Sequence, residues 1–374
     1  MTHHPFFPHQ AKGIYLNHAA ISPLSTPVVQ ALTQCIEERH QEHIENFFNF
    51  QTVLSETKKQ FARLLHTDPS NLAYVPNTSS GFNILVNGFD WKEGDRILLN
   101  TLEFPSNIYP FMNCESLGVK IDYVQAQDHY LSLDDFEQAL TPNTRCLSIS
   151  HVQFLTGQRM DLKALGKLCK NNGTYFSVDG IQSLGASSID VEECGIDFLS
   201  CGSHKWLMAP TGLGLIYVSP RLQAQLKSSI VGWLSVKNEW DLLNYDLSLK
   251  DDASRFETGT MNLMAVAGLN ASLKLFESEG TAKVESKILA LSGYLHEALS
   301  EAKFKVLTPK KAEERLGIVS IQLENADEIY HDLKSRKIEV AVREGKYLRI
   351  SPHFYNTQAE LEQVLKALTQ FKQG

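Results

Sequence analysis

The chain of 374 residues lacks both an excess of positive charge and any long apolar run. Its 35 lysine and arginine residues are outnumbered by 43 aspartate and glutamate residues, so the formal net charge is −8. Binding to nucleic acid or to an anionic membrane needs a basic surface, and neither partner is therefore expected. No apolar stretch approaches the roughly 20 residues that span a bilayer, and the first residues lack the pattern of an export signal. We therefore expect a cytoplasmic protein.

Cysteine pairs with metal-binding spacing are also missing. The six cysteines are Cys35, Cys114, Cys146, Cys169, Cys194 and Cys201. No two of them are spaced as Cys-x-x-Cys, so neither a zinc site nor a disulfide framework is indicated, and we expect no metal. No cysteine follows Cys201, which leaves the C-terminal part of the chain without a thiol.

The chain does contain the alternation that is typical of an α/β protein. Apolar residues make up 43% and charged residues 21%, as in ordinary globular proteins, and the length suffices for two domains. Between about residues 70 and 220, short apolar runs alternate with amphipathic stretches, which predicts a mostly parallel sheet with seven strands. The predicted strands cover residues 72–75, 96–99, 119–124, 146–151, 175–178, 198–201 and 213–218.

The pattern changes from about residue 260 onward. A long helix over residues 263–279 is followed by predicted strands near 317–323 and 347–351, with helices between and after them. We therefore expect a large α/β domain at residues 15–259 and a smaller α+β domain at residues 260–374. Residues 1–14 are expected to pack near the smaller domain.

Two predicted neighbouring strands end at residues of complementary chemistry. The strand at 175–178 is followed by Asp179, and the strand at 198–201 leads to Lys205. These two groups can serve the two ends of one pyridoxal phosphate: Lys205 forms the Schiff base, and Asp179 keeps the pyridine nitrogen protonated. A lysine considered alone is more often a solvated surface charge, so this prediction depends on the pair.

A second group of polar residues is suited to a phosphate. Thr78 and Ser79 follow the strand at 72–75 and open a predicted helix, where free N–H groups and hydroxyls attract an anion. An ordinary helix cap would look the same. The phosphate prediction gains support because Ser203 and His204 would add further donors beside the lysine.

Three other residues complete the predicted site. Phe104 follows a strand end and could stack on the pyridine ring, although it could equally be a core residue. Gln182 could donate a hydrogen bond to the phenolic oxygen of the cofactor or be exposed. Arg349 lies in an apolar strand, where it could bind a substrate carboxylate in a bidentate manner or form a salt bridge at the rim.

Together these residues resemble the class V branch of the fold-type I pyridoxal-phosphate enzymes. This family includes cysteine desulfurases, selenocysteine lyases, isopenicillin N epimerases and kynureninases. The resemblance extends from Tyr15 to Thr357. The motifs that carry it are Asp179-x-x-Gln182, Ser203-His204-Lys205, Glu257-Thr258-Gly259-Thr260 and the segment from Arg349 to Asn356.

The resemblance implies a fold-type I architecture and a role for each matching residue. Lys205 corresponds to the Schiff-base lysine and Asp179 to the partner of the pyridinium, while Gln182 contacts the phenolic oxygen. Arg349 corresponds to the arginine that binds the carboxylate of a small amino-acid substrate. The phosphate positions are Thr78, Ser79, Ser203 and His204, together with Thr260, which in the family reaches the phosphate from the other subunit. A homodimer with shared active sites follows from this last match.

The loops that would meet the substrate side chain are less well defined. We expect them around Asn17, His18, Phe154, Trp233 and residues 341–345. We assign Asn17 and His18 to the substrate and Trp233 to the cofactor.

Different segments of the chain resemble different subgroups of this family. Our expectation of the reaction therefore depends on the missing thiol. Desulfurase-like enzymes usually carry histidine at the position of Phe104, whereas Phe104-Pro105-Ser106-Asn107 and Gly232-Trp233 look more like kynureninase. The segments around Lys205 and Arg349 look more like selenocysteine lyase. Persulfide-forming desulfuration needs a mobile cysteine in the C-terminal domain, and this chain has none after Cys201. We therefore expect a lyase acting at Cα or Cβ without a persulfide cysteine.

Two alternatives stay open. One is a class V aminotransferase, which the sequence does not separate from a lyase. The other is a relative that has lost turnover, against which the intact Lys205, Asp179 and Arg349 argue.

Overall fold

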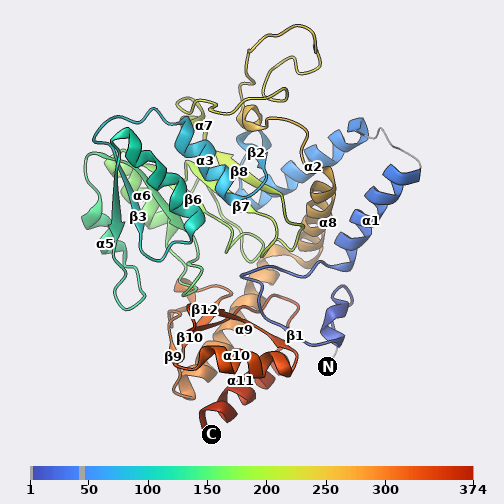
Figure 1. Cartoon of the computed structure of the whole chain (residues 1–374), viewed down its shortest axis with the longest axis vertical. Coiled ribbons are helices and arrows are strands. Elements are labelled where there is room, and N and C mark those ends of the chain that lie inside the picture. Colours follow the sequence, from blue (N-terminus) through green and yellow to red (C-terminus); the bar gives the residue numbers. More distant parts are fainter. Residues whose placement is uncertain (1–2, 42–46, 374) are drawn as a thin grey trace.

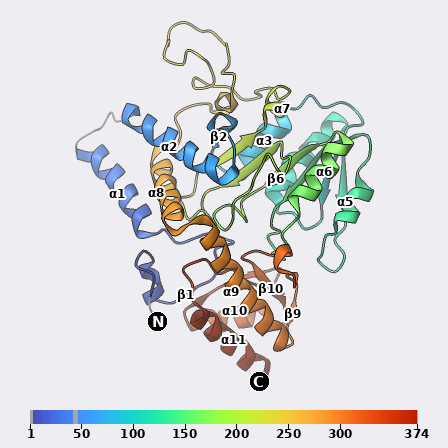
Figure 2. The same cartoon turned by 180° about the vertical axis from the view of Figure 1, so that it is seen from behind.

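The computed structural model describes residues 3–41 and 47–373 and forms a larger and a smaller body (Figures 1 and 2). The larger body is built on a seven-stranded sheet with the order β2-β8-β7-β6-β5-β3-β4. All neighbours from β7 to β4 are parallel, whereas β8 is antiparallel to both β7 and β2. This confirms the expected α/β fold with a mostly parallel sheet. The strands are β2 (Leu72–Val75), β3 (Arg96–Asn100), β4 (Lys120–Val124), β5 (Thr144–Ser150), β6 (Tyr175–Asp179), β7 (Phe198–Gly202) and β8 (Gly214–Val218).

Helices cover both faces of this sheet, which explains why its central strands are apolar on both sides. Along β7, Phe198 faces one core and Leu199 the other, as the alternation of a strand requires. The core with Phe198 includes residues of α3 (Thr78–Gly88), α4 (Tyr109–Met112) and α7 (Pro220–Gln223). The core with Leu199 includes residues of α2 (Phe47–Leu65), α5 (Leu133–Ala139), α6 (Leu162–Asn172) and α8 (Leu263–Glu279).

The ends of α6 show how local sequence sets these elements. The carboxylate of Asp161 accepts a hydrogen bond from the Ala164 N–H at 3.0 Å, and Gly173 closes the helix with a φ of 74°. A side-chain cap at the start and a left-handed glycine at the end are strong helix boundaries. The local sequence thus sets both ends of α6.

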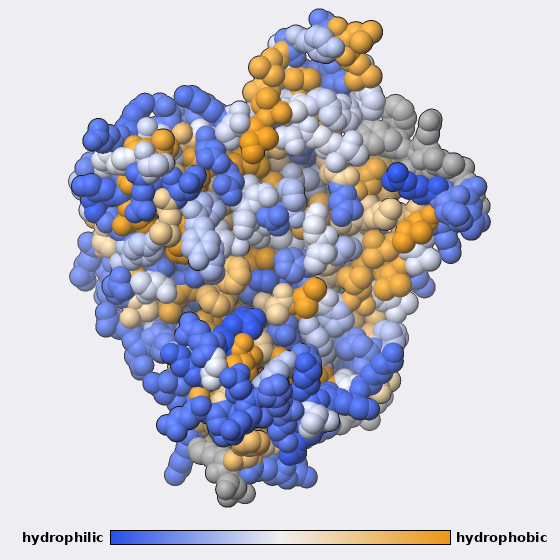
Figure 3. All heavy atoms as spheres, viewed as in Figure 1, coloured by the Kyte–Doolittle hydropathy of each residue, from blue (hydrophilic) through white to orange (hydrophobic). Residues whose placement is uncertain are grey.

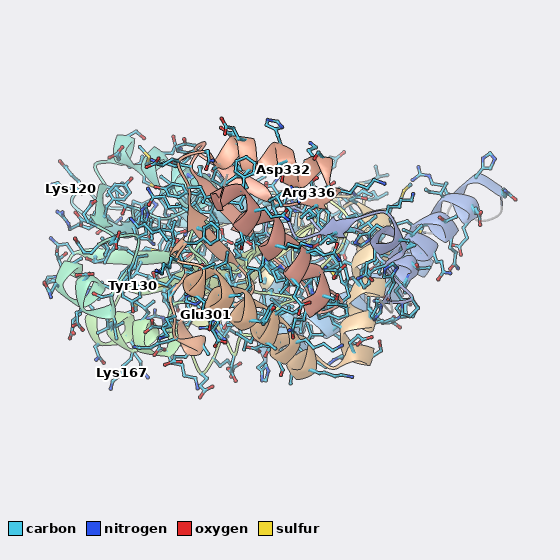
Figure 4. All side chains as sticks on the ribbon, turned by 90° about the horizontal axis from the view of Figure 1, so that it is seen from below. Lys120, Tyr130, Lys167, Glu301, Asp332 and Arg336 are labelled. Atoms are coloured by element: carbon cyan, nitrogen blue, oxygen red, sulfur yellow. The ribbon has the colours of Figure 1, made fainter. Side chains whose placement is uncertain are left out.

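The smaller body contains a four-stranded antiparallel sheet with the order β12-β13-β10-β9. Its core joins this sheet to α9, α10 and α11 through residues such as Leu295, Leu348 and Leu361. Figure 4 shows Asp332 and Arg336 side by side on the outer face of α10, where the Arg336 Nε lies 2.9 Å from the Asp332 carboxylate. The elements are β9 (Lys305–Val306), β10 (Val319–Gln322), β12 (Ala341–Arg343), β13 (Tyr347–Ile350), α9 (Thr281–Glu301), α10 (Ala326–Ser335) and α11 (Gln358–Gln373).

The structure divides the two bodies differently from our expectation of a boundary at residue 260. The helix α8 packs against α1 (Thr26–Gln41) and α2, and its Val266 and Leu269 belong to the core of the larger body. The strand β1 (Ile14–Tyr15) instead pairs with β11 (Ile338–Glu339) of the smaller body. An apolar helix is placed by the partners that bury it, and these lie far away in sequence.

Short 3₁₀ helices connect several of these elements. They are η1 (Pro8–Ala11), η2 (Pro69–Asn71), η3 (Pro105–Asn107), η4 (Asn113–Leu117), η5 (Ala253–Phe256) and η6 (Ala312–Glu314). Within residues 3–41 and 47–373, no helix has both the length and the apolar character that crossing a membrane requires.

Candidate active site

A cavity of about 290 Å³ lies where the carboxyl ends of the parallel strands meet the smaller body. The carboxyl edge of such a sheet is the usual ligand position in open α/β folds. A wider cavity of about 550 Å³ surrounds His151 and Arg159, but it contains none of the predicted site residues. The wall of the 290 Å³ cavity includes Asn77, Thr78, Ser79, Phe104, Ser106, Phe154, Asp179, Gln182, His204, Lys205, Arg343 and Arg349.

Lys205 follows β7 and is only 8% exposed. Burial lowers the pKa of its amine, because the charged form loses hydration, and the nearby charges of Arg349 and Arg343 lower this pKa further. The charge of Asp179 acts in the opposite direction. A buried lysine with a lowered pKa has more of the neutral amine, which is the form that attacks a carbonyl carbon or accepts a proton.

Asp179 ends the neighbouring strand β6 and is 1% exposed. Burial raises the pKa of its carboxyl group, and the backbone N–H of Ile181, which donates to Oδ1 at 2.9 Å, lowers it. The charge of Lys205 also lowers this pKa. The structure thus brings the predicted acid and amine into one cavity from neighbouring parallel strands.

Gln182 lies on the cavity wall with its amide held in one orientation. Its Nε2 donates to the carbonyl oxygen of Ala19 at 3.0 Å, and its Oε1 accepts from the indole N–H of Trp206 at 2.9 Å. Because Trp206 fixes the oxygen side, the amide nitrogen is the group that can meet a ligand, with a second hydrogen to donate. Trp206 follows the lysine directly, and its sequence context does not indicate this contact with Gln182.

The beginning of α3 supplies the polar end of the cavity. Asn77 caps this helix, with its side chain accepting from the Ser80 N–H at 2.9 Å. The Thr78 hydroxyl accepts from the Gly202 N–H at 3.0 Å, and the Ser79 hydroxyl donates to that of Ser106 at 2.9 Å. Hydroxyls and free N–H groups at a helix N-terminus favour a phosphate group. His204, which also lies on the wall, adds a ring nitrogen.

Ser203 does not contribute its side chain to this wall. Its buried hydroxyl lies 2.7 Å from the carbonyl oxygen of Pro210 and 2.9 Å from that of Leu213. The side chain is therefore turned into the loop that follows Lys205, and it stabilises that loop instead of facing a phosphate. The sequence motif alone does not distinguish these two directions.

Phe104 covers the amine from the open side of the cavity. It is 40% exposed, its ring centre lies 5.3 Å from the Lys205 Nζ, and it meets Phe154 edge to face at 5.2 Å. An exposed aromatic ring beside a buried amine is suited to stacking on a flat cofactor.

Glu103, next to Phe104, anchors this turn. Its carboxylate is 8% exposed and accepts hydrogen bonds from four neighbouring residues. The donors are Asn100 Nδ2 at 2.7 Å, Asn107 Nδ2 at 2.9 Å, the N–H and hydroxyl of Ser150 at 2.7 and 2.6 Å, and Gln153 Nε2 at 2.9 Å. A carboxylate with this many donors holds the turn rigidly, a role that no motif around Glu103 indicates.

Arg349 on β13 is buried, but only some of its guanidinium nitrogens have a hydrogen-bond partner. Its Nη1 donates to the carbonyl oxygen of Phe154 at 2.8 Å, whereas Nε and Nη2 have no partner among the described residues. Burial lowers the pKa of this guanidinium to about 9, and the charge of Arg343 adds to the effect. A buried guanidinium with unpaired N–H groups is costly unless an anion binds it, which fits a substrate carboxylate.

Asn17 and His18 do not line the cavity. The ring of His18 is fully buried, with Nδ1 2.7 Å from the Ser351 carbonyl oxygen and Nε2 2.6 Å from the Tyr355 hydroxyl. Burial lowers the pKa of His18 well below its ordinary value. Both ring nitrogens are used within the fold, so His18 ties the N-terminal segment to the smaller body instead of meeting the substrate. Asn17 forms an isolated bridge with Ser351 in the same region.

Thr260 and Trp233 also lie outside this cavity within one chain. Thr260 is exposed and lines a different hollow together with Ser80 and Ile84 of α3. Trp233 is 37% exposed and meets Trp240 edge to face at 5.4 Å. In the single chain, neither of these two predicted residues lines the Lys205 cavity.

The residues of the cavity fit pyridoxal phosphate. Lys205 can bind its aldehyde carbon, Asp179 its ring nitrogen and Gln182 its phenolic oxygen, while Phe104 can cover the ring. The phosphate would meet Thr78, Ser79 and His204. The unpaired N–H groups of Arg349 add a binding point for a carboxylate beside this cofactor. The fold and this site together define a pyridoxal-phosphate enzyme of fold type I.

Comparison with known proteins identifies the family. The family model "Aminotransferase class-V" matches residues 14–364, and the chain belongs to this family. It is 25% identical to a probable cysteine desulfurase of Methanothermobacter thermautotrophicus, covering 93% of this chain and 92% of that protein. It is 26% identical to an uncharacterized aminotransferase of Bacillus subtilis, covering 96% and 94%. A cystine C–S lyase in complex with its product cysteine persulfide superposes with a TM-score of 0.90 at 23% identity, covering 97% and 99%.

These relatives correct one expectation. From the absence of a cysteine after Cys201, we expected a lyase without a persulfide-forming step. Several relatives that match almost the whole chain are instead named probable cysteine desulfurases, and a structural neighbour holds a persulfide product. The absence of a thiol from the C-terminal part of the chain was a poor guide, because sulfur transfer depends on whether an acceptor can reach the substrate and not on where that acceptor lies in the sequence.

Proposed function

We propose that this enzyme cleaves the bond between Cβ and sulfur in cysteine or cystine and releases the sulfur as a persulfide. The observation that carries the proposal is the single cavity in which the Lys205 amine, the Asp179 carboxylate and the unpaired Arg349 guanidinium come together. The names of the relatives support the sulfur chemistry.

In this reaction, each residue of the cavity would have a separate role. When bound, pyridoxal phosphate supplies a covalent link to the amino group and withdraws electrons from Cα. Arg349 binds the substrate carboxylate and thereby orients the bond from Cα to its hydrogen. The neutral amine of Lys205 accepts the proton from Cα, and the carboxylate of Asp179 holds a proton at the ring nitrogen. Phe104 limits the access of water to Lys205.

Two overall reactions satisfy the proposal, and each balances without an external oxidant. Cysteine and an acceptor thiol give alanine and the persulfide of that thiol. Cystine and water give cysteine persulfide, pyruvate and ammonia. In the second reaction, the departing half of the substrate already carries both sulfur atoms.

The test is to incubate the enzyme, loaded with cofactor, with cysteine and with cystine. We expect persulfide together with alanine from cysteine or with pyruvate from cystine, measured by mass spectrometry of thiol-labelled products. Labelling the protein and the small molecules separately identifies the acceptor. If neither substrate yields persulfide, the proposal is wrong.

A class V aminotransferase is the second candidate, favoured by the family and by the relative from Bacillus subtilis. The same cavity would also suit an aminotransferase, since Lys205 could return the proton taken from Cα of the substrate to the cofactor instead of to the substrate. Accumulation of pyridoxamine phosphate with an amino acid alone would identify this reaction.

We also infer a homodimer with shared active sites. The loop at the top of Figure 1 projects from the larger body, and Figure 3 shows apolar side chains gathered on it. Leu243 is 88% exposed, Tyr245 93% and Leu247 70%, which is unusual for a loop facing only water. A second copy would cover this loop and could bring its Thr260 towards the phosphate end of the cavity.

Light scattering tests this inference. We expect a particle of twice the chain mass of 42.0 kDa, and we expect Leu243→Ser combined with Tyr245→Ser to shift it towards the monomer with loss of activity. A fully active monomer at assay concentration would contradict the shared site.

A further inference from the structure

The turn that begins at Lys205 is held by a histidine of the smaller body. Within this turn Met208 has a left-handed backbone with a φ of 51°, which a residue other than glycine keeps only where its surroundings fix it. Three carbonyl oxygens of the turn accept hydrogen bonds: that of Lys205 from the Met208 N–H at 2.9 Å, that of Trp206 from His353 Nε2 at 3.0 Å, and that of Leu207 from the Ser272 hydroxyl on α8 at 2.5 Å. His353 follows β13 by three residues and is the donor that the smaller body supplies.

The ring of His353 has one defined tautomer. Its Nδ1 lies 2.8 Å from the backbone nitrogen of Phe354, whose N–H can only donate, so Nδ1 carries no proton. The proton is therefore on Nε2, which donates to the carbonyl oxygen of Trp206. Burial lowers the pKa of this ring to about 4, so the ring is neutral at neutral pH. His353 thus acts as a fixed hydrogen-bond donor and not as a charge.

The side chain of Trp206 connects this turn to Gln182. The indole N–H donates to Gln182 Oε1 at 2.9 Å, and Gln182 Nε2 donates to the carbonyl oxygen of Ala19 at 3.0 Å. The indole can only donate and the carbonyl can only accept, so a flipped amide would face two mismatched partners. The amide therefore keeps one orientation, with one N–H left for the phenolic oxygen of the cofactor.

Two glycines show how closely Trp206 is held between the two bodies. A Cβ at Gly317 of the smaller body would lie 2.2 Å from the indole Cη2, and a Cβ at Gly185 would lie 2.2 Å from the carbonyl oxygen of Trp206. Gly185 is three residues beyond Gln182, so the loop of Gln182 contacts the backbone of Trp206 directly. A shift of the Trp206 peptide would therefore move the indole and the amide of Gln182 together.

We infer that His353 is a positioning residue for the cofactor: by holding the carbonyl group of Trp206, it keeps the amide of Gln182 directed at the phenolic oxygen. His353 is fully buried and does not line the cavity, so it acts only through Trp206. Arg349 precedes it by four residues in the same segment, so the segment that holds this guanidinium in the cavity also orders the cofactor site. The inference concerns the cofactor and does not depend on the sulfur chemistry proposed above.

Spectrophotometric titration of the cofactor-loaded enzyme tests this inference without any substrate. A donor to the phenolic oxygen competes with the protonated Schiff-base nitrogen for that oxygen, so loss of the donor raises the pKa at which the visible band changes. We expect His353→Leu to raise this pKa by about half a unit to one unit, the effect of one hydrogen bond. Gln182→Leu should raise it at least as much, and the double variant no further, because both changes act on one contact.

Further variants separate positioning from stability. His353→Gln keeps an N–H donor near the position of Nε2 and should leave the pKa within about 0.2 units of the wild type, whereas His353→Asn places its amide near Nδ1 and should behave like His353→Leu. Trp206→Phe keeps a ring without the N–H and should raise the pKa as Gln182→Leu does. His296→Leu is the matched control, because the buried His296 Nε2 likewise donates to a backbone carbonyl oxygen, that of Thr308, at 3.0 Å. Its loss should lower the Tm without a shift of the pKa.

Equal pKa shifts in His353→Leu and His296→Leu would overturn the inference, since a general loosening of the smaller body would explain both. Shifts that add in the double variant of His353 and Gln182 would also overturn it, because His353 would then act by another route. If His353→Leu does not fold, Trp206→Phe decides, and an unchanged pKa in that variant refutes the link to Gln182. An enzyme that shows the expected shifts but forms no persulfide keeps this inference and refutes the proposed function. An enzyme that forms persulfide with an unchanged pKa in these variants does the reverse.

Discussion

Replacing Lys205 by alanine is expected to abolish the covalent attachment of pyridoxal phosphate and to reduce kcat by on the order of 10⁴-fold, the upper range for a positioned acid–base group. The amine is buried in the cavity at 8% exposure, and no other lysine lines its wall among the described residues. The visible absorption band of the lysine-bound cofactor should disappear. Reduction with borohydride followed by peptide mass spectrometry should find no labelled lysine.

Two controls separate this effect from misfolding. Lys205→Arg keeps a positive charge but has no amine that can bind the aldehyde, so it should lose the band as well. Lys167→Ala, on the exposed side of α6, should keep both the band and the activity. A borohydride-stable adduct that persists in Lys205→Ala would show that another residue carries the cofactor.

Replacing Asp179 by alanine is expected to lower kcat by about 10²- to 10³-fold, which is the cost of removing one preorganised electrostatic partner at an active site. Cofactor binding should weaken but persist, because Lys205 and the phosphate end of the cavity are unchanged. Asp179→Glu keeps the carboxylate and should retain part of the activity. Full activity in Asp179→Ala would refute the role of this residue.

The stability of the cofactor-free protein provides a second measurement on Asp179. Burial raises the pKa of its carboxyl group in the folded chain, so the ionised form is less favourable there than in the unfolded chain. At a pH above the ordinary pKa of aspartate, this carboxylate therefore destabilises the fold, and the effect fades as the pH falls. Asp179→Asn should leave the melting temperature at pH 7 unchanged or higher while activity falls. A buried charged group that lowers the stability of the fold is typical of an active site, where it is kept for activity.

The positions of the strands and the two central site residues could be predicted because their signals are local. Apolar runs such as those of β2 and β6 alternate with amphipathic helices, and strand ends in a parallel sheet meet at one edge. Asp179 and Lys205 follow adjacent strands, so their proximity needs only the fold class. Arg349 was placed for a similar reason, as a charge within an apolar strand whose neighbours are buried.

Several assignments failed because they depend on the direction of one side chain. Ser203 belongs to the same motif as Lys205, yet its hydroxyl turns towards the carbonyl oxygens of Pro210 and Leu213. His18 is next to the segment that lines the cavity, yet both ring nitrogens bond to the smaller body. A motif specifies which residue is present, whereas the partners around it decide where the side chain points.

The sequence by itself determined the α/β class, most strand positions, and the amine and acid that would hold the cofactor. Only the tertiary structure showed that Arg343 stands beside Arg349, since this depends on the register of β12 and β13. It also showed that Trp206 orients Gln182 and that Glu103 anchors the turn of Phe104. The physical reason is the same in each case: periodicity and strand ends are written in nearby residues, whereas register, burial and hydrogen-bond partners arise from chain segments that meet only when the protein folds.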